Sequence, residues 1–299
     1  MVKLGVAVTA ATVAILVAEF LRRKRRSLPL YGWLGLVALV CAELLMFRGI
    51  EPVATYFTPI AWSAYILMAD AAVFAMAGRS RLRNARREFG HVALLSIPLW
   101  LIFEAYNLRL QNWTYTGVPM GWLASWFGYG WSFATIMPAI FETADAIELL
   151  GWFPSAAPVN LGPRGSKVMM IAGAICLALP LALPQRIGSY LFGLAWIGFF
   201  LLLDPLNRHL GLRSLLSDLA QGRRGRLYSL LASGWACGWL WEFWNYWAAA
   251  KWHYTFPILQ RWKIFEMPAL GYLGFLPFAL ECFAMYVTAA WLAGWLRRA

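Results

Sequence analysis

The sequence is poor in charge. Only 13% of its 299 residues are Asp, Glu, Lys or Arg, whereas 61% are hydrophobic, and the mean hydropathy is +0.59. Several apolar runs reach the roughly 20 residues that a helix needs to cross a bilayer. The scarcity of charge therefore excludes an ordinary soluble domain and predicts an all-α polytopic membrane protein.

Familiar catalytic and metal-binding signatures are missing as well. The chain has no glycine-rich phosphate loop, no serine-nucleophile elbow and no dinucleotide fingerprint. Its 3 His are scattered without the His/Glu spacing of a metal-binding helix, and its 4 Cys fall inside apolar runs with no Cys-x-x-Cys. We therefore expect no metal, no cofactor and no disulfide framework.

Acidic residues are scarce relative to basic ones, 14 against 26, which gives a net charge of +12. The basic residues do not indicate nucleic-acid binding, because most lie in short loops between apolar runs, where they set membrane orientation. The loops in question are Arg22 to Arg26, Arg79 to Arg87, Arg164 to Lys167, Arg208 to Arg226 and the terminal Arg297/Arg298. By the positive-inside rule, we expect the N-terminus outside and the C-terminus in the cytoplasm, with a bacterial inner membrane as the location.

The apolar runs predict nine transmembrane helices. The first is followed by Arg22 to Arg26 rather than by a small-residue cleavage site, which is the reverse of a signal peptide, so we expect a retained helix. The predicted spans are Val2 to Leu21, Leu30 to Phe47, Tyr56 to Ala77, Phe89 to Leu108, Trp131 to Leu150, Val168 to Leu183, Ile187 to Leu206, Leu227 to Ala250 and Ala269 to Leu296.

Two stretches of the chain, 103–142 and 241–281, share one pattern. In each, a Glu precedes an Asn by three residues, a Trp-x-Tyr and a Pro follow, and a Pro-x-x-x-Glu closes the stretch. Upstream, Trp62 precedes Asp70 by eight residues, as Trp196 precedes Asp204. The matched positions of the two stretches are Glu104/Glu242, Asn107/Asn245, Trp113/Trp252, Tyr115/Tyr254, Pro119/Pro257, Pro138/Pro277 and Glu142/Glu281.

This internal repeat predicts a domain organisation. We expect an N-terminal helix with its basic loop (1–26), repeat A (27–150), a Pro- and Gly-rich connecting loop (151–165) and repeat B (166–299). Each repeat holds four helices. Because that number is even, the two copies run the same way through the membrane, about a pseudo-twofold axis along its normal.

The repeated acids are candidates for proton chemistry. An ionised carboxylate is costly in hydrocarbon, so Glu104, Glu142, Glu242 and Glu281 are expected to face the bundle interior in the neutral form, where each can donate a proton. Trp and Tyr faces nearby would stabilise a transient cation. We expect Pro138 and Pro277, one turn earlier, to bend their helices beside Glu142 and Glu281.

Structural interpretations stay open beside this one. Glu104 and Glu242 could bond to Asn or Tyr on a neighbouring helix and act only as interhelical glue. Taken alone, Trp113, Tyr115, Trp252 and Tyr254 fit an aromatic belt at the outer interface. Acids without a counterpart in the other repeat are more readily structural; they are Glu19, Glu43 and Glu148.

The second stretch resembles the membrane-integral lycopene cyclases. The residues that carry the likeness are Trp244-Asn245, Trp252-x-Tyr254, Gly271/Gly274 and Pro277 to Glu281. In that family, a repeated helical unit protonates one end of a polyene, closes a ring through a carbocation and removes a different proton. The resemblance implies that Glu281, and by the repeat Glu142, are acids, and that Asn245 and Asn107 occupy the position of a family acid.

Together these patterns predict an integral-membrane isoprenoid or carotenoid enzyme, a cyclase, isomerase or hydratase. Its partners would be an apolar substrate from the bilayer and membrane lipid. Glu281 and Glu242 would exchange protons with the substrate, Trp239, Trp244 and Tyr254 would wall the cation, and the second half would be the active one. Two alternatives stay open: a proton-coupled transporter or lipid-handling protein, and a non-catalytic membrane scaffold.

Overall fold

We describe the fold from a computed structural model, in which residues 1–296 are described. The chain is all-α apart from four short strands. Its long helices are α1 (Val2–Arg23), α2 (Leu30–Phe47), α3 (Phe57–Ala77), α5 (Arg86–Leu110), α6 (Trp122–Leu149), α7 (Pro163–Ala182), α9 (Phe192–His209), α11 (Gly225–Trp247) and α12 (Phe275–Leu292). Shorter elements join them: α4 (Arg81–Asn84), β1 (Trp113–Thr116), α8 (Gln185–Gly188), η1 (Ser189–Leu191), α10 (Leu215–Ala220), β2 (Lys251–Tyr254), β3 (Lys263–Ile264), β4 (Met267–Pro268) and η2 (Ala269–Gly274).

Seven of the helices in residues 1–296 are long and apolar enough to cross a membrane. The prediction of an all-α membrane protein is thus confirmed, whereas the number of nine spans is not. Helices α6 and α11 are long enough to cross a membrane, but their mean hydropathy is too low for them to be counted as candidate spans. Their sequences, WLASWFGYGWSFATIMPAIFETADAIEL and GRLYSLLASGWACGWLWEFWNYW, owe their apolar surface to Trp, Phe and Tyr more than to aliphatic side chains. Indole and phenol groups count as weakly polar because they carry a hydrogen-bonding atom.

Most helix bounds differ from the predicted spans by a few residues, and two of the differences bear on the site. Helix α6 begins at Trp122, nine residues before the predicted start at Trp131. The prediction missed these nine residues because they are aromatic and glycine-rich rather than aliphatic. The last predicted span is divided into η2 and α12. Pro277 therefore lies in the first turn of α12, where a missing N–H breaks no helical hydrogen bond, and the expected bend beside Glu281 is wrong. Pro138 does lie inside α6.

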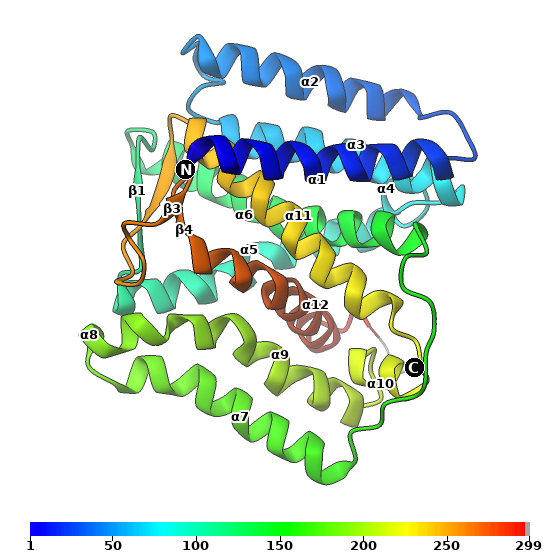
Figure 1. The fold of residues 1–299 in the computed structure, drawn as a ribbon. Helices are drawn as coiled ribbons and strands as arrows, with labels where there is room; N and C mark the ends of the chain where they lie inside the picture. Colours follow the sequence, from blue (N-terminus) through cyan, green and yellow to red (C-terminus); the bar gives the residue numbers. More distant parts are fainter. Residues whose placement is uncertain (297–299) are drawn as a thin grey trace.

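The long helices run side by side between two ends of the molecule (Figure 1). The strands and the N-terminus mark one end, called here the strand end. Helices α4 and α10 mark the other, called the basic end because its loops hold Arg22 to Arg26, Arg79 to Arg87 and Arg208 to Arg226. Helices α2 and α3 form one side of the bundle, α7 and α9 the opposite side, and α11 and α12 lie between them.

Helix packing follows the same scheme in both halves. Helix α2 packs on α3 as α7 packs on α9, and α6 contacts α3 and α5 as α12 contacts α9 and α11. Helix α1 lies outside this scheme and packs mainly against α11. The duplication stays a prediction from the sequence, and this matched packing agrees with it. The end of repeat B, 297–299, with Arg297 and Arg298, lies outside the described residues.

Strands β1 and β2 join the two halves. They pair antiparallel, with Trp113 opposite Tyr254 and Tyr115 opposite Trp252. Each Trp of one half therefore faces the Tyr of the other, as a twofold axis between the strands requires. The pairing satisfies the backbone N–H and C=O groups that the two strands turn toward each other.

At the basic end, a buried Asp in each half organises the loop that follows it. Asp204 is fully buried and accepts hydrogen bonds from Ser214 Oγ at 3.0 Å, Leu215 N at 2.8 Å and Leu216 N at 2.9 Å. Asp70 accepts the equivalent bonds from Ser80 Oγ at 2.8 Å and Leu82 N at 2.9 Å. These carboxylates cap α10 and α4, because they satisfy N–H groups that a helix start leaves unpaired.

We predict that Asp204→Ala lowers the stability of the protein by about 2–4 kcal/mol, because three buried donors lose a charged acceptor at once. Asp218→Ala, on the helix α10 that Asp204 caps, is the matched control. Asp218 pairs with Arg223 at the surface, where an ion pair contributes about 1 kcal/mol or less. Thermal unfolding in detergent measures both; equal shifts would show that Asp204 does not act as a buried cap.

Candidate functional site

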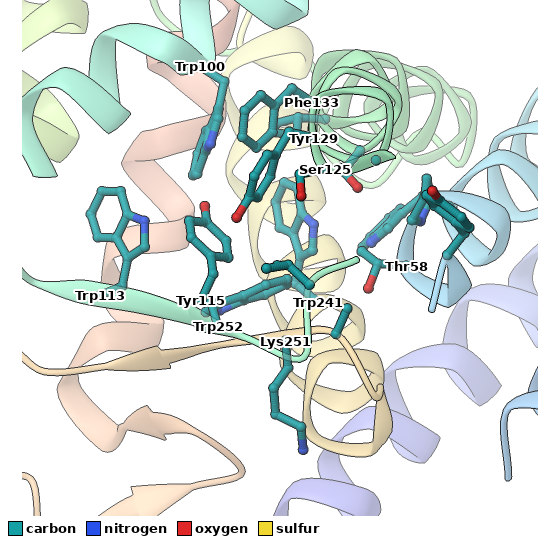
Figure 2. Close-up of a pocket in the computed structure, with 18 of the residues that line it drawn as sticks. Thr58, Trp100, Trp113, Tyr115, Ser125, Tyr129, Phe133, Trp241, Lys251 and Trp252 are labelled. Atoms are coloured by element: carbon teal, nitrogen blue, oxygen red, sulfur yellow. The ribbon is translucent and has the colours of Figure 1, made fainter. Parts of the chain in front are cut away.

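A cavity opens between the two halves, next to β1 and β2. Its empty volume, mouth included, is about 1060 Å³. Residues from α3, α5, α6, α9, α11, α12 and both strands line it, and Figure 2 shows many of them converging on one space. The aromatic members of the lining are Tyr56, Trp62, Trp100, Trp113, Tyr115, Tyr129, Phe133, Trp196, Trp241, Trp252, Tyr254, Phe275 and Phe278. We call this the aromatic pocket.

The walls of the aromatic pocket are packed rings. The ring centroids of Trp62 and Trp241 are 5.0 Å apart, and those of Trp196 and Phe278 are 5.1 Å apart. Trp100 meets Phe278 edge-on at 5.8 Å. Such walls exclude water and present the electron-rich faces of indoles, which attract a positive charge. The pocket therefore suits an apolar ligand that is cationic or becomes so.

Glu242 stands behind the aromatic pocket on α11. It is fully buried, and its Oε1 accepts a hydrogen bond of 2.9 Å from the hydroxyl of Tyr254. Trp252 Nε1 donates in turn to that hydroxyl at 3.0 Å. The second carboxyl oxygen, Oε2, is buried and has no hydrogen-bond partner among the described residues. Tyr254 lines the pocket, so it connects the buried carboxyl group to the cavity.

Glu104 holds the matching place on α5. Its Oε1 accepts from the Tyr115 hydroxyl at 2.5 Å, from Trp100 Nε1 at 2.9 Å and from Trp113 Nε1 at 3.3 Å. All three donors line the aromatic pocket. In Figure 2, the hydroxyl groups of Tyr115 and Tyr129 are directed toward the same part of the cavity. Two carboxyl groups, one from each half, thus reach one pocket through a tyrosine.

Both tyrosines keep their protons at neutral pH. Burial, and then the nearby Glu242 carboxyl group, raise the pKa of the Tyr254 hydroxyl well above its ordinary value. The same two causes, with Glu104 as the neighbour, raise the pKa of Tyr115. Each hydroxyl can therefore donate to its Glu and pass a proton along the same line.

Asn107 and Asn245, which occupy matched positions in the two repeats, hold the strands in place. Asn245 is fully buried; its Nδ2 donates to Trp252 O at 2.9 Å and its Oδ1 accepts from Trp252 N at 2.9 Å. Asn107 makes the same pair of bonds with Trp113, at 2.9 and 3.1 Å. An amide side chain supplies a donor and an acceptor on two separate atoms, which an ionised carboxylate cannot do. These residues therefore position the pocket lining rather than touch a ligand.

Glu142 and Glu281 are buried but do not line the aromatic pocket. Glu142 lies near the basic end, 3.2 Å from Arg81 Nη1, and Arg81 also pairs with Asp145. Glu281 accepts a 2.8 Å hydrogen bond from the backbone N–H of Phe199 on α9. Within residues 1–296, Glu281 and Glu242 share no hydrogen-bond partner, and their action as a pair stays a prediction.

Trp239 and Trp244 also fall outside the pocket lining. Trp239 stacks on Tyr272 with ring centroids 3.9 Å apart, and Trp244 Nε1 donates to Glu43 at 3.0 Å. Glu43 is thereby engaged in a helix-to-helix contact. The remaining unmatched acids are in ion pairs, Glu19 with Arg22 and Arg23, and Glu148 with Arg226.

Several lining residues escape sequence reasoning. In the sequence, Trp62 and Trp196 were noted only because they mark the repeat, but both residues line the aromatic pocket. Trp100 precedes Glu104 by one helical turn and Trp241 precedes Glu242 directly, so their closeness to a repeated acid was an available signal. Tyr129 lies in the part of α6 that precedes the predicted span, and Phe133 lies inside that span, but no pattern singled out either residue.

Comparison with protein-family models, with curated proteins and with solved structures finds no match for this chain. The likeness to lycopene cyclases therefore rests on the residues quoted above. Among residues 1–296, no group of three or more His, Cys, Asp or Glu side chains is arranged to hold a metal ion.

We predict that Asn245→Asp lowers stability by about 2–4 kcal/mol, because it replaces a buried donor with an acceptor and leaves the Trp252 carbonyl unpaired. The control is Asn160→Asp. Asn160 is exposed and accepts from Arg208 at 2.9 Å, so an aspartate is tolerated there. Thermal unfolding in detergent compares them; an Asn245→Asp protein as stable as wild type would mean that the amide is not needed.

Proposed function

We propose that this protein is an integral-membrane isoprenoid or carotenoid enzyme that isomerises a polyene by proton addition, ring closure and proton loss. The observation that carries the proposal is the aromatic pocket, onto which two carboxyl groups, the partly buried Glu104 and the fully buried Glu242, open through Tyr115 and Tyr254. Acid next to cation-stabilising rings, with water excluded, is what such a reaction requires.

The reaction would begin with a proton passing from a Glu carboxyl group through its Tyr hydroxyl to the terminal double bond of the substrate. The π electrons of that bond form the new C–H bond and leave a tertiary carbocation. A second double bond of the chain attacks it, which forms the ring C–C bond and moves the cation. The other Glu–Tyr pair then removes a proton from a neighbouring carbon and restores a double bond. No atom is gained or lost, and no oxidant is needed.

The geometry favours Glu104 and Glu242 over Glu142 and Glu281 as the acids. The former pair contacts tyrosines that line the pocket, whereas Glu142 is paired with Arg81 and Glu281 with the backbone of α9. We propose that the latter two are positioning residues. Because residues of both halves line the aromatic pocket, one shared site is favoured over an active second half with a degenerate copy.

An apolar segment beside the pocket offers a route for the substrate. Its members stand at the start of α6, next to the lining residues Ser125 and Gly128, and each is at least 59% exposed: Met120, Trp122, Leu123, Trp126 and Phe127. Large exposed apolar side chains mark contact with lipid or another apolar partner. We propose that the segment lies at the outer membrane interface and that a substrate enters there from the bilayer. The N-terminus would then be outside and the basic end in the cytoplasm.

The test is expression in bacteria that accumulate lycopene or another linear isoprenoid, followed by chromatography of the extract. We expect the wild type to form a new product that contains a ring absent from the linear substrate. Glu104→Gln and Glu242→Gln should each lower its formation by about 10²–10⁴-fold, because each removes a general acid or base. Glu148→Gln, at a partly exposed ion pair far from the pocket lining, is the control and should leave the product unchanged.

The alternatives have distinct outcomes. Unchanged pigment from a well-expressed wild type counts against the reaction. If the purified protein then binds a linear isoprenoid without converting it, lipid handling becomes the better interpretation. Solute entry coupled to acidification in proteoliposomes would identify a transporter. Full activity in both Gln variants would keep an enzyme but overturn the assignment of its acids.

A further inference from the structure

Two polar groups on one wall of the aromatic pocket have no partner among the described residues. They are the indole N–H of Trp62 and the hydroxyl group of Thr58, both on α3. Trp62 is 1% exposed, and the Thr58 oxygen is likewise shielded from solvent. Leaving a buried donor unpaired costs about 1–3 kcal/mol, so a folded protein rarely keeps one without a reason.

The two residues lie close together on one helix. Thr58 and Trp62 are four residues apart on a helix and therefore share one face of α3. Figure 2 shows the Thr58 side chain at the edge of the pocket opposite Trp113 and Tyr115. The Trp62 ring is held between Trp241 at 5.0 Å and Trp244 at 4.9 Å, so it cannot turn its N–H toward another acceptor without breaking both contacts.

Three other polar groups of the lining are already engaged. The Tyr115 hydroxyl donates to Glu104, Ser125 Oγ donates to the carbonyl of Pro119 at 2.7 Å, and Lys251 Nζ donates to the carbonyl of Tyr246 at 2.6 Å. In Figure 2, the Lys251 amino group is directed away from the ring cluster. Among the lining residues, Thr58 and Trp62 are the two whose side-chain polar atoms are buried without a partner among the described residues.

An indole N–H is a donor only, and a threonine hydroxyl can donate or accept. Their joint complement is an oxygen atom with free lone pairs. We infer that the ligand of the aromatic pocket is an oxygenated isoprenoid, a prenyl alcohol or ketone, whose oxygen binds Trp62 and Thr58 while its hydrocarbon chain contacts the rings. This inference rests on the proposed function for the isoprenoid class, and adds the oxygen, which a pure hydrocarbon lacks.

The test compares two probes that differ by one atom: all-trans-geranylgeraniol and the hydrocarbon in which hydrogen replaces its hydroxyl group. Isothermal titration calorimetry of the full-length protein in detergent measures binding of each. We expect the wild type to bind the alcohol at least about 10-fold more tightly, because two hydrogen bonds are gained. Absence of this preference, including failure to bind either probe, overturns the inference.

Three variants locate the effect. Trp62→Phe keeps an aromatic ring without the N–H, and Thr58→Val keeps the shape without the hydroxyl. Each should weaken binding of the alcohol by about 3- to 10-fold and leave binding of the hydrocarbon within about twofold. Trp239→Phe is the matched control, because Trp239 Nε1 is equally buried and unpartnered but lies outside the pocket lining; it should change neither.

If Thr58→Val and Trp62→Phe weaken both probes equally, or neither, the oxygen is not read at this wall and a trapped water is the partner instead. The outcome is separable from that for the proposed function. Conversion of a hydrocarbon polyene without any preference for the alcohol would keep the enzyme and remove this inference. A clear preference for the alcohol without conversion of any polyene would do the reverse.

Discussion

The pairing of β1 with β2 is the contact on which the site depends. Each strand has only four residues and would leave its backbone polar groups unpaired if it stood alone, so the two halves satisfy each other. Asn107 and Asn245 fasten each strand to the end of its own helix. Since the strands carry Tyr115 and Tyr254, this single antiparallel contact brings Glu104 and Glu242 into reach of one cavity.

The helices could largely be predicted because hydrocarbon demands long uninterrupted apolar runs. The predicted bounds of α2, Leu30 to Phe47, agree with the structure, since Pro29 and Arg48 stand at its ends. Aromatic helices were harder. The start of α6 was missed because Trp, Tyr and Gly give little hydropathy, and Pro277 was misplaced because the sequence does not reveal that α12 begins at Phe275.

For the site, the spacing of residues in the sequence indicated which positions repeat, but not which helices lie next to one another. Repeated positions identified Glu104, Glu242 and the Trp-x-Tyr loops that contact them. To predict which side chains of two helices meet, one must know how each helix is rotated about its own axis. The spacing of residues does not give that rotation. Glu281 follows Glu242 on the next helix, yet it faces the backbone of α9. Trp62 meets Trp241 across the two halves, 179 positions apart, so only the folded chain shows that they share a wall.

The location of the aromatic pocket between two matching halves has a consequence for how it holds a ligand. If the halves were identical, a molecule with different head and tail could lie in either of two opposite poses with equal energy. Thr58 stands four residues before Trp62, and the corresponding place before Trp196 is Phe192. Thr58 lines the cavity, whereas Phe192 does not. Under the proposed function, this difference between the two halves would give the two poses of a ligand unequal energies.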